Sequence, residues 1–265
     1  MKLKLYPEYK DSGVKWIGKI PLNWQADKFT NFIHLKHGHQ FGEDDFTDYG
    51  LKIVKITQLK QNGVIDLDGC SFIDEARLRH FKKYLLCEGD VLMALSGATV
   101  GKVAKINFPI ENTLQNYRVG NFIPLRGLSK DFIYYILLSK SFNVQMNLFV
   151  VQTAQGNIGK KDFKQITISI PPKNEQTEIV NFLNKKTSEI DLTIEKDTRL
   201  IELLKEKRTA LINHVVTKGL DPTVKMKDSG VEWIGEIPED WELRKISQSF
   251  DIIGSGTTPK SQEER

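Results

Sequence analysis

The chain contains Lys10-Asp11-Ser12-Gly13-Val14-Lys15-Trp16-Ile17-Gly18-Lys19-Ile20-Pro21-Leu22-Asn23-Trp24 near its start and Lys227-Asp228-Ser229-Gly230-Val231-Glu232-Trp233-Ile234-Gly235-Glu236-Ile237-Pro238-Glu239-Asp240-Trp241 near its end. We call these stretches the first and second copies of the opening motif. A period of roughly two hundred residues is far longer than a solenoid unit, so each copy is expected to begin a domain with its own core. The repeat therefore predicts a domain, a connector, and the start of a second domain that is cut short at Arg265.

The opening motif itself indicates packing rather than chemistry. Each copy carries two tryptophans and an Ile-Pro pair that can pin the chain onto its domain. Downstream the copies diverge but stay alignable, since Lys28 corresponds to Lys245 and the Gly38 region to Gly254–Lys260. Two copies that share their opening residues but differ in the sequence that follows indicate two related domains with different targets. We expect residues 227–265, whose domain core is missing, to be loosely ordered or to rest on a neighbour.

Composition limits the class of protein. A chain of 265 residues with 40% hydrophobic residues can bury one core and have an extension. Of the net charge of +4, the surplus lies between Lys28 and Ile170, with 18 basic against 13 acidic residues, so a basic face could meet phosphates there. Cys70 and Cys87 have neither disulfide-framework nor zinc spacing, as is typical of a reducing cytoplasm. No apolar run is long enough to cross a membrane.

The pattern between residues 25 and 172 mixes strands and helices. Runs rich in β-formers lie at 51–57, 91–96, 102–107 and 166–170, and helical runs lie at 75–84 and 130–149. They show no regular βαβ alternation, which predicts an α+β fold. We therefore expect four segments: an N-terminal segment 1–24, a mixed α/β domain 25–172, a long helix 173–219, and a linker with the start of a second domain at 220–265.

A single long helix is predicted after Pro171-Pro172. Asn174 can cap it, and Glu175 and Glu178 place favourable negative charge in its first turn. Gly219 supplies a stop. Some 44 residues make a rod of about 66 Å.

Apolar residues follow this helix in two columns seven residues apart, which predicts a coiled-coil seam. The seam consists of Val180, Leu183, Ile190, Ile194, Ile201, Leu204, Leu211 and Val215, and it is interrupted by Thr187, Asp197 and Arg208. Eight basic and eight acidic residues between Glu175 and Lys218 balance on the other faces. This balance of charges favours a helix that packs against a partner helix and exposes its opposite face to solvent. It argues against a helix that lies on DNA.

Several catalytic motifs can be set aside. Gly97–Lys102 is one residue short of a phosphate loop and lacks its Ser or Thr. Ile170–Lys173 has neither the amide or carboxylate nor the aromatic residue of an adenine methyltransferase loop. His34, His37 and His39 have no acidic or cysteine partner at metal-ligand spacing and are interpreted as surface imidazoles. We expect no nucleotide hydrolysis, methyl transfer or metal site.

Amide, hydroxyl and basic side chains gather in glycine-containing loops. The candidate DNA-binding residues are Thr99, Lys102, Gln115, Asn116, Arg118, Gln152, Thr153, Gln155, Asn157, Lys160 and Lys161. Gln and Asn can pair with adenine edges and Arg with guanine, while Lys holds phosphates. The alternative is that these are polar loops with ordinary turn chemistry.

In combination the motifs are specific. They are the two opening-motif copies, Leu95–Lys102, Gln155-Gly156-Asn157-Ile158, and Ile170-Pro171-Pro172-x-x-Glu175-Gln176 with Ile190-Asp191 farther along the helix. Over its whole length the chain resembles the specificity (S) subunit of type I restriction-modification systems. The resemblance implies a target-recognition domain that reads one half of a split site in double-stranded DNA, followed by a conserved spacer helix. Full subunits of this family have two such domains separated by two antiparallel helices, which dock two adenine-N6 methyltransferase (M) subunits.

This chain departs from that pattern because its second domain stops at Arg265 and the second helix is absent. It resembles a half-subunit, for which we expect a homodimer. The resemblance also implies a non-catalytic subunit without a cofactor of its own. S-adenosylmethionine, ATP and magnesium are expected only on the M subunits and on the restriction (R) subunits that join through them. Two alternatives stay open: a coiled-coil assembly factor whose α+β domain binds protein, and a stand-alone nuclease.

Overall fold

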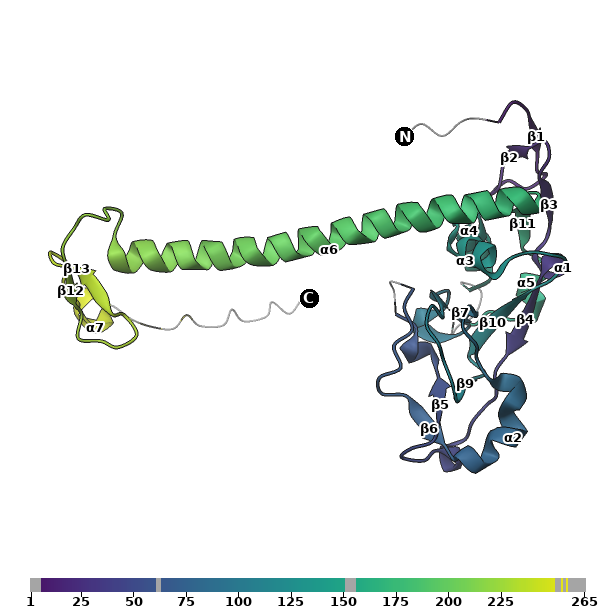
Figure 1. Cartoon of the computed structure of the whole chain (residues 1–265), viewed down its shortest axis with the longest axis horizontal. Coiled ribbons are helices and arrows are strands. Elements are labelled where there is room, and N and C mark those ends of the chain that lie inside the picture. Colours follow the sequence, from purple (N-terminus) through teal and green to yellow (C-terminus); the bar gives the residue numbers. More distant parts are fainter. Residues whose placement is uncertain (1–5, 61–62, 151–155, 251–253, 255, 257–265) are drawn as a thin grey trace, which may run out of the picture. The chain divides into compact units, whose positions relative to one another are not determined.

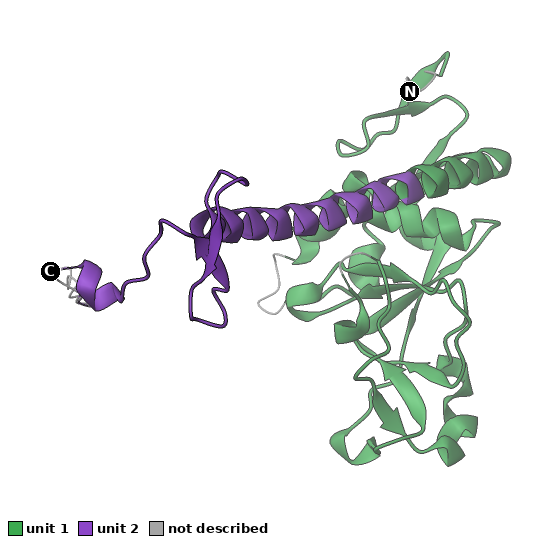
Figure 2. Cartoon of the chain, turned by 60° about the vertical axis from the view of Figure 1, so that its left-hand side comes forward, with its two compact units in different colours: residues 1–187 green, residues 188–265 purple. Residues whose placement is uncertain are grey.

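The computed structural model describes residues 6–60, 63–150, 156–250, 254 and 256. It divides into two compact units, Met1–Thr187 and Ser188–Arg265, which are coloured separately in Figure 2. The first unit mixes short strands and helices and ends inside one long helix, α6 (Lys173–Lys218), whose remainder belongs to the second unit (Figure 1). The predicted α+β fold followed by a long helix is confirmed.

The first copy of the opening motif folds into a hairpin of β1 (Tyr9–Asp11) and β2 (Lys19–Pro21), with Tyr9 opposite Pro21. The Asp11 carboxylate accepts a hydrogen bond of 2.8 Å from the Gly13 amide, which helps to form the turn. Gly13 and Gly18 both have positive φ, at 73° and 70°, where a side chain would be strained.

The second copy repeats this hairpin with β12 (Met226–Asp228) and β13 (Glu236–Pro238). Asp228 accepts from the Gly230 amide at 2.9 Å, and Gly230 and Gly235 take the same positive φ, at 73° and 68°. Loose order was one of two expectations for residues 227–265, and this hairpin does not show it. The same turn bonds fix the backbone in both copies.

In the part of the first unit that the structure describes, three small sheets accompany the hairpin. The central sheet has the order β4 (Ile33–His37), β10 (Val119–Pro124), β7 (Val91–Ala94) and β8 (Val103–Lys105), and all its pairs are antiparallel. A second sheet has the order β6 (Ser71–Ile73), β5 (Leu51–Val54) and β9 (Thr113–Gln115), in which β5 and β9 are parallel. A two-stranded sheet joins β3 (Gln25–Lys28) to β11 (Thr167–Ile170).

Two helices supply much of the core. Helix α3 (Lys130–Leu138) packs across β10, β7 and β8, and α4 (Lys140–Val150) is tied to β11 by the Gln145 amide, which bonds to both backbone groups of Thr167. The largest buried cluster combines these helices with the central sheet and includes Phe29, Phe122, Phe142 and Phe163.

The shorter helices among the described residues are α1 (Phe29–Phe32), α2 (Leu78–Phe81), α5 (Lys160–Phe163) and α7 (Ile246–Ser249), with 3-10 turns at Glu43–Asp45, Ile56–Gln58, Glu75–Arg77, Lys82–Tyr84 and Gly97–Thr99. The helix predicted over 75–84 is thus broken into short pieces. The one predicted over 130–149 is split at Ser139, whose hydroxyl oxygen accepts from the Phe142 amide and donates to the Ile136 carbonyl. A side chain that bonds its own backbone in this way ends one helix and starts the next.

Helix α6 begins at Lys173, the first residue of the segment predicted to contain it, and two residues before the start that a cap at Asn174 would set. Its first backbone bond runs from the Gln176 amide to the Pro172 carbonyl at 3.0 Å, so Pro172 holds the cap position and the predicted cap at Asn174 is wrong. The stop at Gly219 is confirmed: it has φ of 75° and its amide bonds the Val215 carbonyl.

The predicted seam of α6 divides into two parts. Val180 is buried in the core of the first unit, as is the polar Gln176, so this face is already covered by the chain's own domain. Tyr135 of α3 also donates its hydroxyl to Asn184 at 2.7 Å. From Ile190 onward the seam is open, with Ile190, Ile194, Ile201, Leu204 and Leu211 between 53% and 59% exposed.

Candidate functional site

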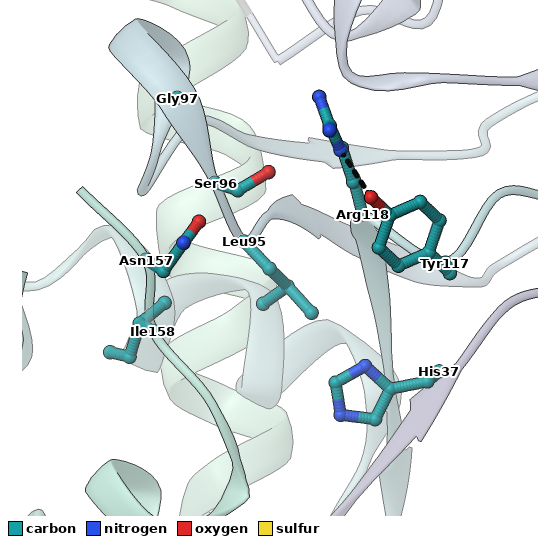
Figure 3. Close-up of a pocket in the computed structure, with 8 residues that line it drawn as sticks. All are labelled: His37, Leu95, Ser96, Gly97, Tyr117, Arg118, Asn157 and Ile158. Carbon is teal, nitrogen blue, oxygen red and sulfur yellow. Dashed lines mark hydrogen bonds between the residues drawn. The ribbon is translucent and has the colours of Figure 1, made fainter. Parts of the chain in front are cut away.

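Three loops that are far apart in sequence are held together by backbone hydrogen bonds. The Leu95 amide donates to the Arg118 carbonyl, and the Ile158 amide donates to the Leu95 carbonyl, each over 2.9 Å. The loops that follow β7, precede β10 and precede α5 therefore run side by side. They surround a cleft of about 560 Å³, drawn in Figure 3, which is lined by His37, Leu95, Ser96, Gly97, Tyr117, Arg118, Asn157 and Ile158.

Arg118 is the exposed cation of this cleft. Its Nε donates to the Tyr117 hydroxyl at 2.7 Å, and its guanidinium carbon lies 5.4 Å from the centre of the Tyr117 ring. The tyrosine thus orients the planar guanidinium through Nε and leaves its terminal nitrogens outside this bond (Figure 3). An oriented guanidinium can donate two parallel hydrogen bonds to a guanine edge or to a phosphate.

His37 ends β4 at the floor of the cleft and is half-buried. Burial lowers its pKa below the ordinary value of 6.5, and the positive charges of Lys160 and His34 act in the same direction. A hydrogen bond with the Tyr117 backbone opposes these effects. Burial therefore favours the neutral ring, and Lys160, from α5, acts on His37 through its charge.

The glycine loop contributes hydroxyl groups. The oxygens of Ser96 and Thr99 are buried and have no hydrogen-bond partner among the described residues, and Ser96 lines the cleft. Gly97 and Gly156 both have positive φ, at 76° and 59°, and a β-carbon on Gly156 would lie 3.6 Å from the Gly97 carbonyl oxygen. The positive φ, in which another residue would be strained, therefore accounts for glycine at both positions, since a β-carbon on either would make only ordinary contacts.

The predicted site residues separate into groups. Arg118 and Asn157 line the cleft, and Lys160 lies within electrostatic reach of His37. Lys161 is exposed beside Lys160 in α5, while Lys102 and Thr99 are half-buried on the glycine loop. Gln152, Thr153 and Gln155 lie outside the described residues.

Gln115 and Asn116 serve the fold. Gln115 is fully buried, and its amide donates to the carbonyls of Lys36 and Val119 at 2.9 and 2.7 Å. Asn116 is 7% exposed, and its side-chain oxygen accepts from the Arg118 amide. These amides fix the loop that carries Arg118, so neither is presented to a base edge in this structure. Gly38 lies against them, where a β-carbon would clash with the Gln115 carbonyl.

Sequence reasoning missed His37, Ser96 and Tyr117 as lining residues. Tyr117 adjoins Arg118, and an aromatic next to an arginine is the one local signal that was present. The histidine cluster was interpreted as surface imidazoles, and His34 is exposed, but His37 is half-buried and His39 packs among Phe41, Phe81 and Tyr84, with ring centres 4.9–5.3 Å apart. Within the described ranges no group of three metal-ligating side chains comes together.

Two further sequence predictions concern chemistry and location. Cys70 is buried and Cys87 is exposed, and both are free thiols. Burial raises the pKa of the Cys70 thiol. Among the residues that the structure describes, no helix is both long and apolar enough to cross a bilayer.

Comparison with known proteins identifies the family. A family model described as the type I restriction modification DNA specificity domain matches residues 21–204. The MjaVIII specificity subunit of Methanocaldococcus jannaschii is 27% identical over 189 residues, which are 70% of this chain and 44% of that protein. The putative MjaX specificity subunit of the same organism is 27% identical over 264 residues, 96% of this chain and 60% of that protein. The chain thus spans about half the length of the curated relatives it matches.

Solved structures share the fold. One, from work on complex assembly and conformational transition of the type I R-M system, aligns with a TM-score of 0.61 at 17% identity and covers 80% of this chain and 49% of that chain. The HsdS subunit from Thermoanaerobacter tengcongensis aligns with a TM-score of 0.54 at 16% identity, covering 80% and 48%. Since the family model extends over well more than half of the residues, the chain belongs to the type I restriction modification DNA specificity domain family.

Proposed function

We propose that this chain is a non-catalytic, sequence-recognising subunit of a type I restriction-modification complex, and that the cleft around Arg118 reads one half of a bipartite site in double-stranded DNA. The observation that carries the proposal is the convergence of three loops rich in donors, acceptors and positive charge on one cleft. Family membership supplies the context. Methyl transfer to adenine N6 and ATP-driven cleavage, with S-adenosylmethionine, ATP and magnesium, then belong to partner M and R subunits.

Roles within the site follow from exposure and chemistry. Arg118 and Asn157 are the proposed base contacts because both line the cleft and can pair with guanine and adenine edges. Lys102, Lys160 and Lys161 are the proposed phosphate contacts, since lysine acts as a point charge without base preference. Thr99, Gln152, Thr153 and Gln155 stay in the proposal as further DNA contacts on sequence grounds. Gln115 and Asn116 are proposed to act indirectly, through the position of Arg118.

Selection from a randomised duplex library tests this proposal with the chain bound to its methyltransferase partner. One short sequence element should be enriched, and affinity should fall steeply with salt as condensed counterions are released. No enrichment together with salt-independent binding would argue for the alternative of a protein-binding assembly factor. Cleavage by the purified chain alone would argue for the nuclease.

The open seam of α6 supports a second part of the proposal, a homodimer with antiparallel helices. A helix of 46 residues is about 69 Å long, so its first and last turns cannot meet within one chain. If the helix ends of two chains align, Lys173 lies opposite the partner's Lys218. The same pairing sets Ile190 opposite Ile201 and Leu204 opposite Thr187, so the two seam columns face each other along the pair. The polar positions also fall in the seam, with Asp197 opposite Ile194.

Sedimentation equilibrium tests the homodimer. Replacing Leu204 and Leu211 with Asp places charges in the seam and should split the dimer, whereas Lys196→Asp, at an exposed position, should leave it intact. A wild-type chain that is monomeric at micromolar concentration, with α6 helical by circular dichroism, would refute this part of the proposal and leave the DNA-reading part standing.

M subunits would dock on the outer faces of the helix pair.

A further inference from the structure

A helical segment outside the cleft carries a run of positive charge. Helical turns follow one another from Glu75 to Tyr84 and include α2, and the chain has no acidic residue between Ala76 and Cys87. The basic residues of this segment are Arg77, Arg79, His80, Lys82 and Lys83. The described lining of the cleft includes none of them, so this charge is a feature separate from the site described above.

The two faces of this segment differ. Leu78, Phe81 and Leu85 recur at intervals of three and four residues and pack in the hydrophobic cluster that includes residues of β5, β6 and β9. Lys82 and Lys83 follow Arg79 by three and four residues, a spacing that gathers side chains on one face of a helix, and all three are exposed. We call Arg79, Lys82 and Lys83 the α2 patch. The patch faces solvent, on the side away from the core.

The charges of the α2 patch are not paired within the described part of the chain. Arg77 is used by the fold, since its Nη1 lies 2.7 Å from a carboxylate oxygen of Asp45. Among the described residues no salt bridge reaches the patch, although Glu75 precedes Arg79 by four residues. Like charges three and four residues apart on a helix repel and destabilise it. An anionic partner would offset this repulsion.

His39 connects the segment that carries the patch to the cleft. The centre of its ring lies 4.9 Å from that of Phe81 and 5.3 Å from that of Tyr84. Its carbonyl oxygen accepts a hydrogen bond of 2.9 Å from the amide of Tyr117, which lines the cleft. His39 follows the end of β4 by two residues, and Figure 1 shows α2 below that strand. The α2 patch and the cleft are therefore neighbours on the first unit.

Double-stranded DNA is the partner whose chemistry fits both the charge and the position of the patch. A duplex carries one phosphate per strand about every 3.4 Å, so the base pairs read in a cleft are followed at once by backbone that passes over the neighbouring surface. Lysine and arginine hold such phosphates without base preference. An acidic protein surface would also pair with these charges, but the position of the patch beside the cleft favours DNA.

We propose that the α2 patch binds backbone phosphates of double-stranded DNA next to the base pairs that the cleft reads. The proposal rests on the proposed DNA recognition by the cleft and deepens it, because it adds a second contact surface formed by Arg79, Lys82 and Lys83. Since phosphates carry no sequence information, the patch should raise the affinity for every sequence and leave the preference between sequences unchanged.

Neutralising the patch tests this proposal. The chain, in complex with its methyltransferase partner, is titrated at several salt concentrations with a duplex that carries the selected sequence and with a scrambled duplex of equal length. Arg79→Gln, Lys82→Gln and Lys83→Gln together should lower the affinity for both duplexes by about tenfold or more at low salt. The slope of log affinity against log salt should fall by about 2 to 3, because fewer counterions are released. The ratio of the two affinities should stay as in the wild type.

Two further variants separate the patch from net charge and from folding. Lys10→Gln, Lys15→Gln and Lys19→Gln together remove the same charge from exposed positions of the same unit and should have a much smaller effect. Arg79→Lys with Lys82→Arg and Lys83→Arg keeps the charge and should bind like the wild type. Equal losses for the two neutralised variants would overturn the proposal, as would a loss in the charge-keeping variant or wild-type binding by the neutralised patch.

Size-exclusion chromatography follows the protein partner in the same samples. Loss of the M subunit from the complex of the neutralised patch variant would assign the surface to a protein contact and overturn the proposal.

Ethylation interference locates the contacts on the DNA. In the wild-type complex, ethylation of phosphates just outside the recognised element should reduce binding, and the neutralised patch variant should become insensitive at these positions. The same interference pattern in both proteins would overturn the proposal. If the wild-type complex shows no preference between the selected and scrambled duplexes, sequence reading by the cleft fails. The difference in salt slope between the two neutralised variants then still decides whether the patch binds phosphates.

Discussion

Trp24 donates its indole Nε1–H to Glu175 over 3.0 Å, which joins residues 151 positions apart in sequence. Tyr6 donates its hydroxyl to the same carboxylate, and burial together with this bond raises the pKa of Tyr6 to about 12. One glutamate in the first turn of α6 therefore fixes the opening motif to the helix. The negative charge is also favourable at a helix N-terminus.

Trp24→Phe should weaken the attachment of the opening motif to α6 without removing every hydrogen-bond donor to Glu175. The carboxylate keeps Tyr6 and Asn23 as donors, so no buried charge is left unpaired, and the loss should be about 1 kcal/mol in the free energy of unfolding. Urea denaturation measures it. Trp16→Phe is the control, since Trp16 is 43% exposed and lies in the same hairpin. An equally large loss in the free energy of unfolding for Trp16→Phe would show that the hydrogen bond between Trp24 and Glu175 makes no specific contribution.

Gln115→Ala should mainly lower stability and Arg118→Ala should mainly weaken DNA binding, because the Gln115 side chain supports the loop and the Arg118 side chain faces the cleft. Removing the buried amide leaves the Lys36 and Val119 carbonyls without their donor and should cost about 1–3 kcal/mol of stability. Removing the exposed guanidinium should change stability by less than about 0.5 kcal/mol and weaken DNA binding by about 1–3 kcal/mol. Thermal denaturation and DNA titration of both variants distinguish these roles; a stable Gln115→Ala chain that binds DNA poorly would reverse the assignment.

His37 should couple DNA binding to pH. Its pKa lies below 6.5 in the folded chain, so protonation favours the unfolded state, and stability should fall as the pH drops below 6.5. A phosphate brought to the cleft would favour the protonated ring and raise the same pKa. DNA affinity should therefore rise, relative to a His37→Gln variant, as the pH falls through this range. Anisotropy titrations at several pH values measure the difference, and parallel curves for the two proteins would exclude the coupling.

The extent of sequence-based prediction differed between elements for physical reasons. The long helix is a local structure, set by apolar periodicity and a terminal glycine, and it was predicted. The repeat of the opening motif was recognised as a packing element, but its hairpin, set by turn glycines and Asp side chains, was not predicted. Strand β10 was missed although it lies inside the central sheet, because Gly120 and Asn121 break the apolar alternation. Asn121 is tolerated there only because its amide donates to the buried Asp90 carboxylate at 2.8 Å, a partner 31 residues away.

The candidate site was predicted as loops but not as a cleft. Polar residues at 96–102, 115–118 and 156–161 were visible in the sequence, whereas the bonds that join Leu95 to Arg118 and Ile158 are tertiary. For the same reason Gln115 looked like a surface amide, although its donors are satisfied inside the fold. A polar side chain in a loop gives no sign in the sequence of whether its partner is backbone or DNA.

The recognised sequence should be an interrupted palindrome. In an antiparallel homodimer the two identical clefts are related by a two-fold axis, so the half-sites must be inverted repeats with a spacer set by the length of α6. Methylome sequencing of cells that express the chain with its methyltransferase partner measures the motif directly. Arg118→Ala should relax one position in both half-sites at once, whereas Lys161→Ala should weaken every sequence alike and reduce the salt slope by about one. Because the two clefts come from the same residues, a modified motif without two-fold symmetry would refute the homodimer, even if Arg118 proved to be a base contact.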